Sequence, residues 1–100
     1  MNAIKNLSQL KKAITNKQQF QIVKHYLHED FAGQIRTPNV IQTNGFYSII
    51  EDDPSSPIST ANFGKGYWCS YGKAGQYEFN DTGILFKLPN GKPCMEIAFL

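Results

Sequence analysis

The sequence contains no long hydrophobic run, and no stretch approaches the roughly 20 apolar residues that a membrane-spanning helix requires. Acidic residues are missing from residues 1–28, and the 100 residues include only two cysteines, Cys69 and Cys94. The first absence argues against a membrane protein. Two cysteines cannot complete a zinc site, and the N-terminal segment has no apolar signal core. We therefore expect a cytoplasmic chain with two buried free thiols.

Motifs for catalysis are also missing. Residues 64–66 (GKG) lack the glycine spacing and the following Ser or Thr of a phosphate-binding loop. His25 and His28 lie three residues apart, but their segment passes from strand into loop, so the spacing does not indicate a shared metal-binding face. Cys69 has no nucleophile-elbow sequence around it. We predict a protein that is not an enzyme, with no cofactor, no metal site and no catalytic residue.

The sequence does contain enough apolar material for one folded domain over residues 1–100. Hydrophobic residues make up 41% of the chain, aromatic residues 13% and charged residues 18%. Disordered chains are poorer in aromatic residues and richer in charge, so this chain is expected to fold. At this length a second hydrophobic core would be too small to be stable.

One short helix is predicted at the N-terminus. Apolar residues at positions 4, 7, 10 and 14 recur at steps of three and four, which places them on one helix face. Asn6 or Ser8 can cap the start of this helix, and Asn16 and Lys17 are expected at its end.

The rest of the sequence predicts strands and turns. Asn44-Gly45 between apolar runs is typical of a two-residue hairpin turn, and Pro38 limits part of the preceding strand to a sheet edge or a bulge. Residues 51–66 are predicted to form a long loop, and residues 71–75 a turn or a single helical turn. The expected fold class is α+β: one N-terminal helix packed on a strongly coiled antiparallel sheet, or small partly open barrel, of about six strands.

The first strand is predicted over residues 20–26. Strict alternation would place one set of side chains on the buried face and the other set on the exposed face. The buried set would be Phe20, Ile22 and Tyr26, interleaved with Gln21, Val23 and His25.

Residues 63–73 combine aromatic, basic and glycine residues. Aromatic rings stack on unpaired bases, ammonium groups attract phosphates, and the same aromatic residues anchor protein interfaces. The alternative interpretation is that Trp68 and alternate rings fill the core, and alternation would turn Tyr67 and Trp68 to opposite faces. Together with two helix lysines, the predicted nucleic-acid or partner-binding residues are Phe63, Lys65, Tyr67, Trp68, Tyr71, Lys73, Lys11 and Lys12.

Charge is distributed unevenly along the chain. Residues 1–28 carry five lysines and no acidic residue, whereas residues 29–53 carry five acidic residues and one arginine. Such a polarity suits a charged partner, although a solvated surface would have the same composition.

Several runs of the sequence, NLSQLKKAI, QFQIVKH, GQIR, VIQTNGFYS and YWCSYGKAGQYEF, resemble small phage and mobile-element proteins of Gram-positive bacteria. The resemblance covers nearly the whole chain, and its most specific parts are residues 42–44 with Phe46, and residues 68–69 followed by 73–74. In size and style the chain is also similar to the small polymerase-partner proteins of staphylococcal chromosome cassettes, which act with a family A polymerase in priming DNA synthesis. The resemblance transfers no functional positions.

Together these observations predict a non-enzymatic accessory protein of a mobile genetic element. It is expected to bind a replication protein such as a DNA polymerase, single-stranded nucleic acid, or both. The alternative is an inhibitor of a host defence enzyme that acts by protein–protein binding, with the acidic residues near the loop at 51–66 imitating nucleic-acid phosphates.

Overall fold

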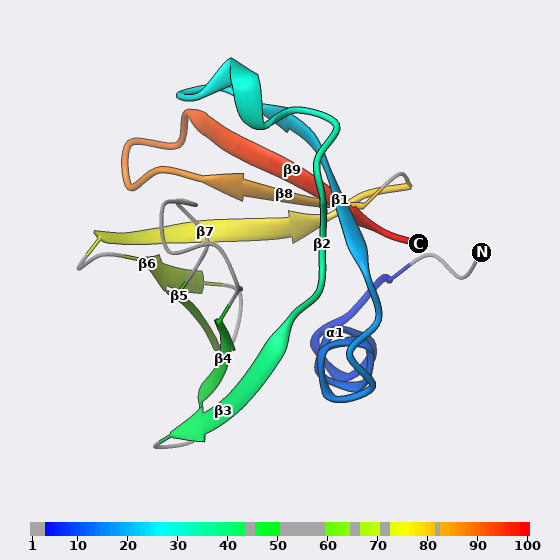
Figure 1. Ribbon diagram of the computed structural model, residues 1–100. Coiled ribbons are helices and arrows are strands. Elements are labelled where there is room, and N and C mark those ends of the chain that lie inside the picture. The colour runs from blue at the N-terminus through cyan, green and yellow to red at the C-terminus, as the bar shows by residue number, and fades with distance from the viewer. Residues whose placement is uncertain (1–3, 44–45, 51–59, 65–66, 71–72, 82) are drawn as a thin grey trace.

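The fold consists of one helix and one antiparallel sheet (Figure 1). The structure, a computed structural model, describes residues 4–43, 46–50, 60–64, 67–70, 73–81 and 83–100. The elements in this part of the chain are α1 (Leu7–Thr15), β1 (Phe20–His25), the short 3₁₀ helix η1 (Glu29–Phe31), β2 (Ile35–Arg36), β3 (Asn39–Thr43), β4 (Phe46–Ile50), β5 (Thr60–Gly64), β6 (Tyr67–Ser70), β7 (Lys73–Phe79), β8 (Ile84–Lys87) and β9 (Pro93–Phe99).

The sheet curls back on itself. Its strand order is β2-β1-β9-β8-β7-β6-β5-β4-β3, and all the paired neighbours are antiparallel. The two end strands, β2 and β3, are separated in the chain only by Thr37 and Pro38. Because each residue spans at most about 3.5 Å, the two ends of the sheet must approach each other at this junction. Figure 1 shows β2 running directly into β3 along one side of the curled sheet. The predicted α+β fold with a strongly coiled antiparallel sheet is confirmed.

The described residues form nine strands, more than the predicted number of about six. Pro38 lies between β2 and β3 at the two sheet edges, as its missing N–H requires. The predicted loop at 51–66 is wrong over Thr60–Gly64, which forms β5. This segment has a weak strand composition, but β4 and β6 pair with it on both sides and supply its backbone hydrogen bonds.

Turns were also predicted at residues 71–75 and at Asn44-Gly45. The predicted turn at 71–75 is wrong over residues 73–75, because β7 already begins at Lys73. The hairpin turn predicted at Asn44-Gly45 lies outside the described residues. The strands that flank it, β3 and β4, pair antiparallel with Thr43 opposite Phe46.

Helix α1 begins and ends close to the predicted positions. Asn6 is its N-cap, and the Asn6 Oδ1 accepts a hydrogen bond from the backbone N–H of Gln9 at 2.8 Å. The helix buries Leu10, Ala13 and Ile14 and lies against β3. Since α1 precedes β1 and η1 follows it, the two helical segments lie at opposite ends of this strand (Figure 1).

The hydrophobic core among the described residues is formed by side chains of α1, β1 and β5 to β9, together with Ile4. No helix among the described residues is long and apolar enough to cross a membrane. The buried apolar residues are Ile4, Leu10, Ala13, Ile14, Phe20, Ile22, Phe63, Trp68, Tyr77, Ile84, Phe86, Cys94, Met95, Ile97 and Phe99.

Candidate functional site

Two of the predicted contact residues, Phe63 and Trp68, lie in the core. Phe63 is 1% exposed and Trp68 is 5% exposed. Both rings pack against Phe86 of β8, with centroid distances of 5.5 Å from Phe63 and 5.0 Å from Trp68. Tyr77 completes this interior cluster, edge-on to Phe63 at 5.7 Å. Their burial corrects the expected placement of Phe63 and Trp68 on a solvent-facing surface, because a ring enclosed by the sheet has no free face for a base or a partner.

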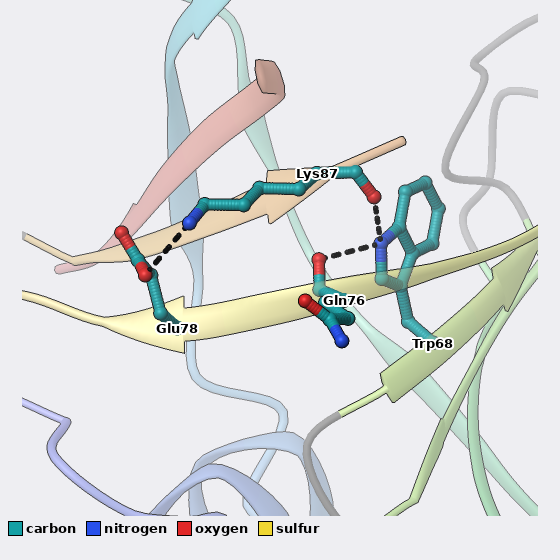
Figure 2. A network of polar contacts seen from close by, with 4 residues as sticks. All are labelled: Trp68, Gln76, Glu78 and Lys87. Carbon is teal, nitrogen blue, oxygen red and sulfur yellow. Dashed lines mark hydrogen bonds and ion pairs between the residues drawn. The ribbon is translucent and has the colours of Figure 1, made fainter. Parts of the chain in front are cut away.

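The polar atom of Trp68 is fully used inside the protein. Its indole N–H donates to the backbone oxygens of Gln76 and Lys87, each at 3.1 Å, and so links β6 to β7 and β8 (Figure 2). Gly75 lies opposite Trp68 in the register of β6 and β7. A side chain at position 75 would collide with the backbone oxygen of Lys87. Gly75 therefore permits the close approach that brings the indole to both acceptors.

Tyr67 is the one ring of the predicted cluster that the structure describes as exposed, with 40% of its surface accessible. Alternation therefore holds for this pair of neighbours: Tyr67 faces outward and Trp68 inward. On the same outer face, Lys87 Nζ forms an ion pair with Glu78 Oε2 at 2.9 Å (Figure 2). Lys65, Tyr71 and the side chain of Lys73 lie outside the described residues.

The predicted basic residues of the helix do not gather around Tyr67. Lys12 is exposed and Lys11 is half-buried on α1. Figure 1 places α1 beside the β1 side of the sheet, and β6, which carries Tyr67, on the other side. The helix lysines and Tyr67 therefore lie in separate regions of the molecule, and the role of the predicted residues in binding stays a prediction.

A feature that the alternation pattern missed is a bulge in β1. The register between β1 and β9 shifts between Ile22 and Lys24, so Val23 is an extra residue. Beyond the bulge, His25 points into the core and is 1% exposed, whereas Tyr26 is 42% exposed. This reverses the prediction that placed Tyr26 with the buried set and His25 with the exposed one. Unbroken alternation would have buried Lys24, and that unfavourable position is the sequence signal for the bulge.

His25 closes the turn that follows β1. Its Nδ1 accepts the backbone N–H groups of Leu27 at 3.2 Å and His28 at 3.0 Å. Since Nδ1 is an acceptor, the proton of the neutral ring is on Nε2. That Nε2 is buried and has no hydrogen-bond partner in the described part of the chain. The rings of His28 and Phe31 pack on His25, at centroid distances of 5.2 Å and 5.8 Å.

The electrostatic environment favours neutral His25. Burial lowers the pKa of this imidazole below its usual value of 6.5, the neighbouring His28 lowers the pKa further, and Asp30 acts in the opposite direction. A buried ring with a free N–H and a lowered pKa is a titratable group that helps to hold the backbone.

Beside His25 lies an exposed apolar surface along β1, the following turn and β2. We call it the β1–β2 surface; its apolar residues are Val23, Tyr26, Leu27 and Ile35, which are 44%, 42%, 55% and 54% exposed. Ile35 lies opposite Gln21 in the register, and Gln21 is two residues before Val23 in β1. Lys24 Nζ lies 4.6 Å from the centroid of the Tyr26 ring and gives this surface a positive charge.

The β1–β2 surface and the His25 turn together form the candidate site. Among the described residues, no group of three or more His, Cys, Asp or Glu side chains converges to hold a metal ion. The described residues therefore place no third metal ligand beside the two histidine rings, His25 and His28. Comparisons of the chain with protein-family models, with curated proteins and with solved structures found no match.

Proposed function

We propose that the chain is a non-enzymatic, cytoplasmic accessory protein of a mobile genetic element that binds a replication protein, such as a DNA polymerase, single-stranded nucleic acid, or both. The observation that carries this proposal is the β1–β2 surface. It has four large apolar side chains on β1, the turn after it and β2, and each is more than two-fifths exposed.

The composition of the β1–β2 surface supports a protein partner. Single exposed apolar residues are ordinary, but a group of them next to a tyrosine and a cation is typical of an interface. Tyr26 offers a rigid ring that can be an anchor, and Leu27 and Ile35 add apolar area that water hydrates poorly. Burial of these side chains against a partner would stabilise the complex by about 25 cal/mol per Å² before the entropic cost of association is subtracted.

Charge supports a partner with acidic groups at the edge of its contact surface. Lys24 belongs to the β1–β2 surface, and it is one of the five lysines of the acid-free segment 1–28. Opposite charges across an interface speed association and favour one docking orientation. Glu29 and Asp30 lie at the η1 end of the surface, so the charge there changes sign over a short distance.

The proposed binding of single-stranded nucleic acid is supported by Tyr67 and by the helix lysines Lys11 and Lys12. A base can stack on the exposed Tyr67 ring, and ammonium groups attract phosphates. The burial of Phe63 and Trp68 removes two of the expected stacking platforms, so the protein-binding half has the stronger structural support. The alternative, an inhibitor of a host defence enzyme, depends on the acidic segment 29–53, of which Glu51, Asp52 and Asp53 lie outside the described residues.

The test measures binding of the purified chain to the purified replication polymerase of the same element. A chain with Leu27→Ser and Ile35→Ser should fold normally and bind at least about tenfold more weakly, since loss of interface anchors typically costs more than 1 kcal/mol each. The matched control is Tyr67→Ser, which removes an exposed ring outside the β1–β2 surface. Equal binding by the double variant and the unaltered chain would overturn the assignment of this surface.

A separate titration tests the nucleic-acid half. We expect a labelled single-stranded oligonucleotide to bind at low salt and to lose affinity steeply as salt is raised, because bound lysines release counterions from the phosphates. No binding at low salt would remove nucleic acid from the proposal and leave the protein partner.

A further inference from the structure

One buried side chain, that of His25, helps to hold the turn after β1 to the sheet. The backbone amides of Leu27 and His28 both donate to Nδ1 of His25. A neutral imidazole has only one acceptor nitrogen, so one lone pair serves both amides. Because the ring is buried, water does not compete for these two hydrogen bonds.

The backbone hydrogen bonds from this segment to the sheet lie at its two ends, and the Phe31 ring between them packs on His25 and against the core. The Tyr26 amide donates to the backbone oxygen of Cys94 at 2.9 Å, and the Gly33 amide donates to the backbone oxygen of Ile22 at 2.7 Å. Between them, the backbone hydrogen bonds of η1 are local, such as that from Phe31 to His28 at 3.1 Å. His25 is therefore the middle anchor of residues 26–33, and this segment carries Tyr26 and Leu27 of the β1–β2 surface.

Protonation would reverse the role of His25. An imidazolium has an N–H on each nitrogen, so Nδ1 would meet the amides of Leu27 and His28 as a third donor with no acceptor. The second nitrogen, Nε2, already has no partner in the described part of the chain. A buried cation without an acceptor is strongly unfavourable, and the turn must open to let water reach the ring.

The charged and titratable groups around His25 come from three sides. From the turn and η1, His28 and Asp30 act on the ring with opposite effects. From β9, Met95 lies opposite His25 in the register, and the buried Cys94 and half-buried Glu96 flank it. On β1 itself, Lys24 turns outward onto the ring of Tyr26.

We propose that His25 is a pH-sensitive latch: the neutral ring keeps the turn of residues 26–31 closed, with Tyr26 and Leu27 in place on the β1–β2 surface, and protonation releases this turn. The role of the latch in regulating binding rests on the proposed function. The latch itself is a property of the free chain and is tested without any partner.

The sign of the effect follows from the lowered pKa of His25. The folded chain prefers the neutral ring more than the unfolded chain does, so the unfolded chain binds the proton more readily. The closed turn is fully stable above the unfolded-state pKa of 6.5, and its stability is lost as the pH falls below that value toward the folded-state pKa.

Amide hydrogen exchange measured by NMR tests the latch residue by residue. We expect the protection factors of the Leu27 and His28 amides to fall between about pH 7.5 and about pH 5, by at most about tenfold for each pH unit, because one proton is linked to the opening of the turn. The Ile97 amide in the middle of β9 is the internal reference and should keep its protection. Unchanged protection of the two turn amides, or an equal loss at Ile97, would overturn a local latch.

Variants at position 25 separate the acceptor from the ring. In His25→Asn, the side-chain amide oxygen takes the place of Nδ1 and does not titrate, so the turn amides should stay protected at both pH values. In His25→Phe, the ring remains but the acceptor is lost, so the same amides should exchange rapidly at both pH values while Ile97 stays protected. The matched control, His28→Asn, should keep a pH dependence that is shifted to higher pH, because His28 lowers the pKa of His25.

Two outcomes with these variants would contradict the proposal: a pH dependence that persists in His25→Asn, or one that disappears in His28→Asn. Partner binding is measured in a separate assay. A latch that works in a chain that does not bind the polymerase would refute the proposed function alone. Polymerase binding by a chain whose turn does not respond to pH would refute the latch alone.

Discussion

Trp68 and His25 are both buried polar rings, but their surroundings differ. The indole N–H of Trp68 has two backbone acceptors, and the ring packs edge-on against Phe86. His25 has two donors on one nitrogen and no partner for the other in the described residues. A polar group with all its hydrogen-bond partners in place stabilises one structure, whereas a titratable group with an unsatisfied atom makes the local structure depend on the pH of the solution. Trp68 therefore stabilises the sheet over β5–β8, whereas His25 carries the proposed pH response at the end of β1.

Truncation of Trp68 should have the largest effect. Trp68→Ala is expected to lower the free energy of unfolding by about 3–5 kcal/mol, because it removes a large buried ring from the interior cluster. Trp68→Phe should cost about 1–2 kcal/mol, since it leaves the oxygens of Gln76 and Lys87 without the indole donor. Denaturant unfolding measures both. The exposed neighbour Tyr67→Ala is the control, and a change of less than about 0.5 kcal/mol in Trp68→Ala would show that the indole is not buried.

A side chain at position 75 should have the next largest effect. Gly75→Ala places a methyl group against the backbone oxygen of Lys87, so the strands must move apart and weaken the hydrogen bonds of Trp68. We expect a loss of about 1–3 kcal/mol, the usual range for overpacking. The control is Ala74→Ser, a change at an exposed position of the same strand. A Gly75→Ala variant as stable as the unaltered chain would refute the close approach of β6, β7 and β8.

Acidification should have an intermediate effect through His25. Stability should be constant with respect to this group above pH 6.5 and should decrease by at most about 1.4 kcal/mol per pH unit below it, until the folded-state pKa is reached. Thermal unfolding of the unaltered chain and of His25→Asn at each pH measures the difference. Parallel pH profiles for the two proteins would show that His25 does not contribute.

Loss of the surface ion pair should have the smallest effect. Lys87 and Glu78 are joined at 2.9 Å, but both side chains reach solvent, so Glu78→Gln should change the free energy of unfolding by about 0–1 kcal/mol. The effect should decrease further in high salt. A loss as large as that of Trp68→Phe would mean that this pair, and not the indole, holds β7 to β8.

The sequence predicted the features that depend on local chemistry. The helix followed from the spacing of its apolar residues, and its cap is Asn6, one of the two candidates with Ser8. Pro38 lies between the two edge strands as its missing N–H requires. The segment Thr60–Gly64 was not predicted as a strand, because its order comes from pairing with β4 and β6 and not from its own composition.

The candidate site was harder to predict than the fold. The aromatic and basic residues at 63–73 were predicted to form a binding surface, but their spacing did not show that Phe63 and Trp68 pack against Phe86, which is far along the chain. The position of His25 depends on one extra residue, Val23, which changes the face of every later side chain in β1. A bulge of this kind is decided by pairing with β9, so only the avoidance of a buried Lys24 could have indicated it.

Fluorescence of the single tryptophan tests the central claim, that the ring cluster of β5–β8 is interior and the binding surface lies elsewhere. Quenching by acrylamide or iodide is measured on the free chain and again with the polymerase bound. An interior Trp68 predicts the emission of an apolar environment and weak quenching that the partner does not change. Strong quenching in the free chain that bound polymerase then suppresses would place Trp68 in the interface and contradict the account.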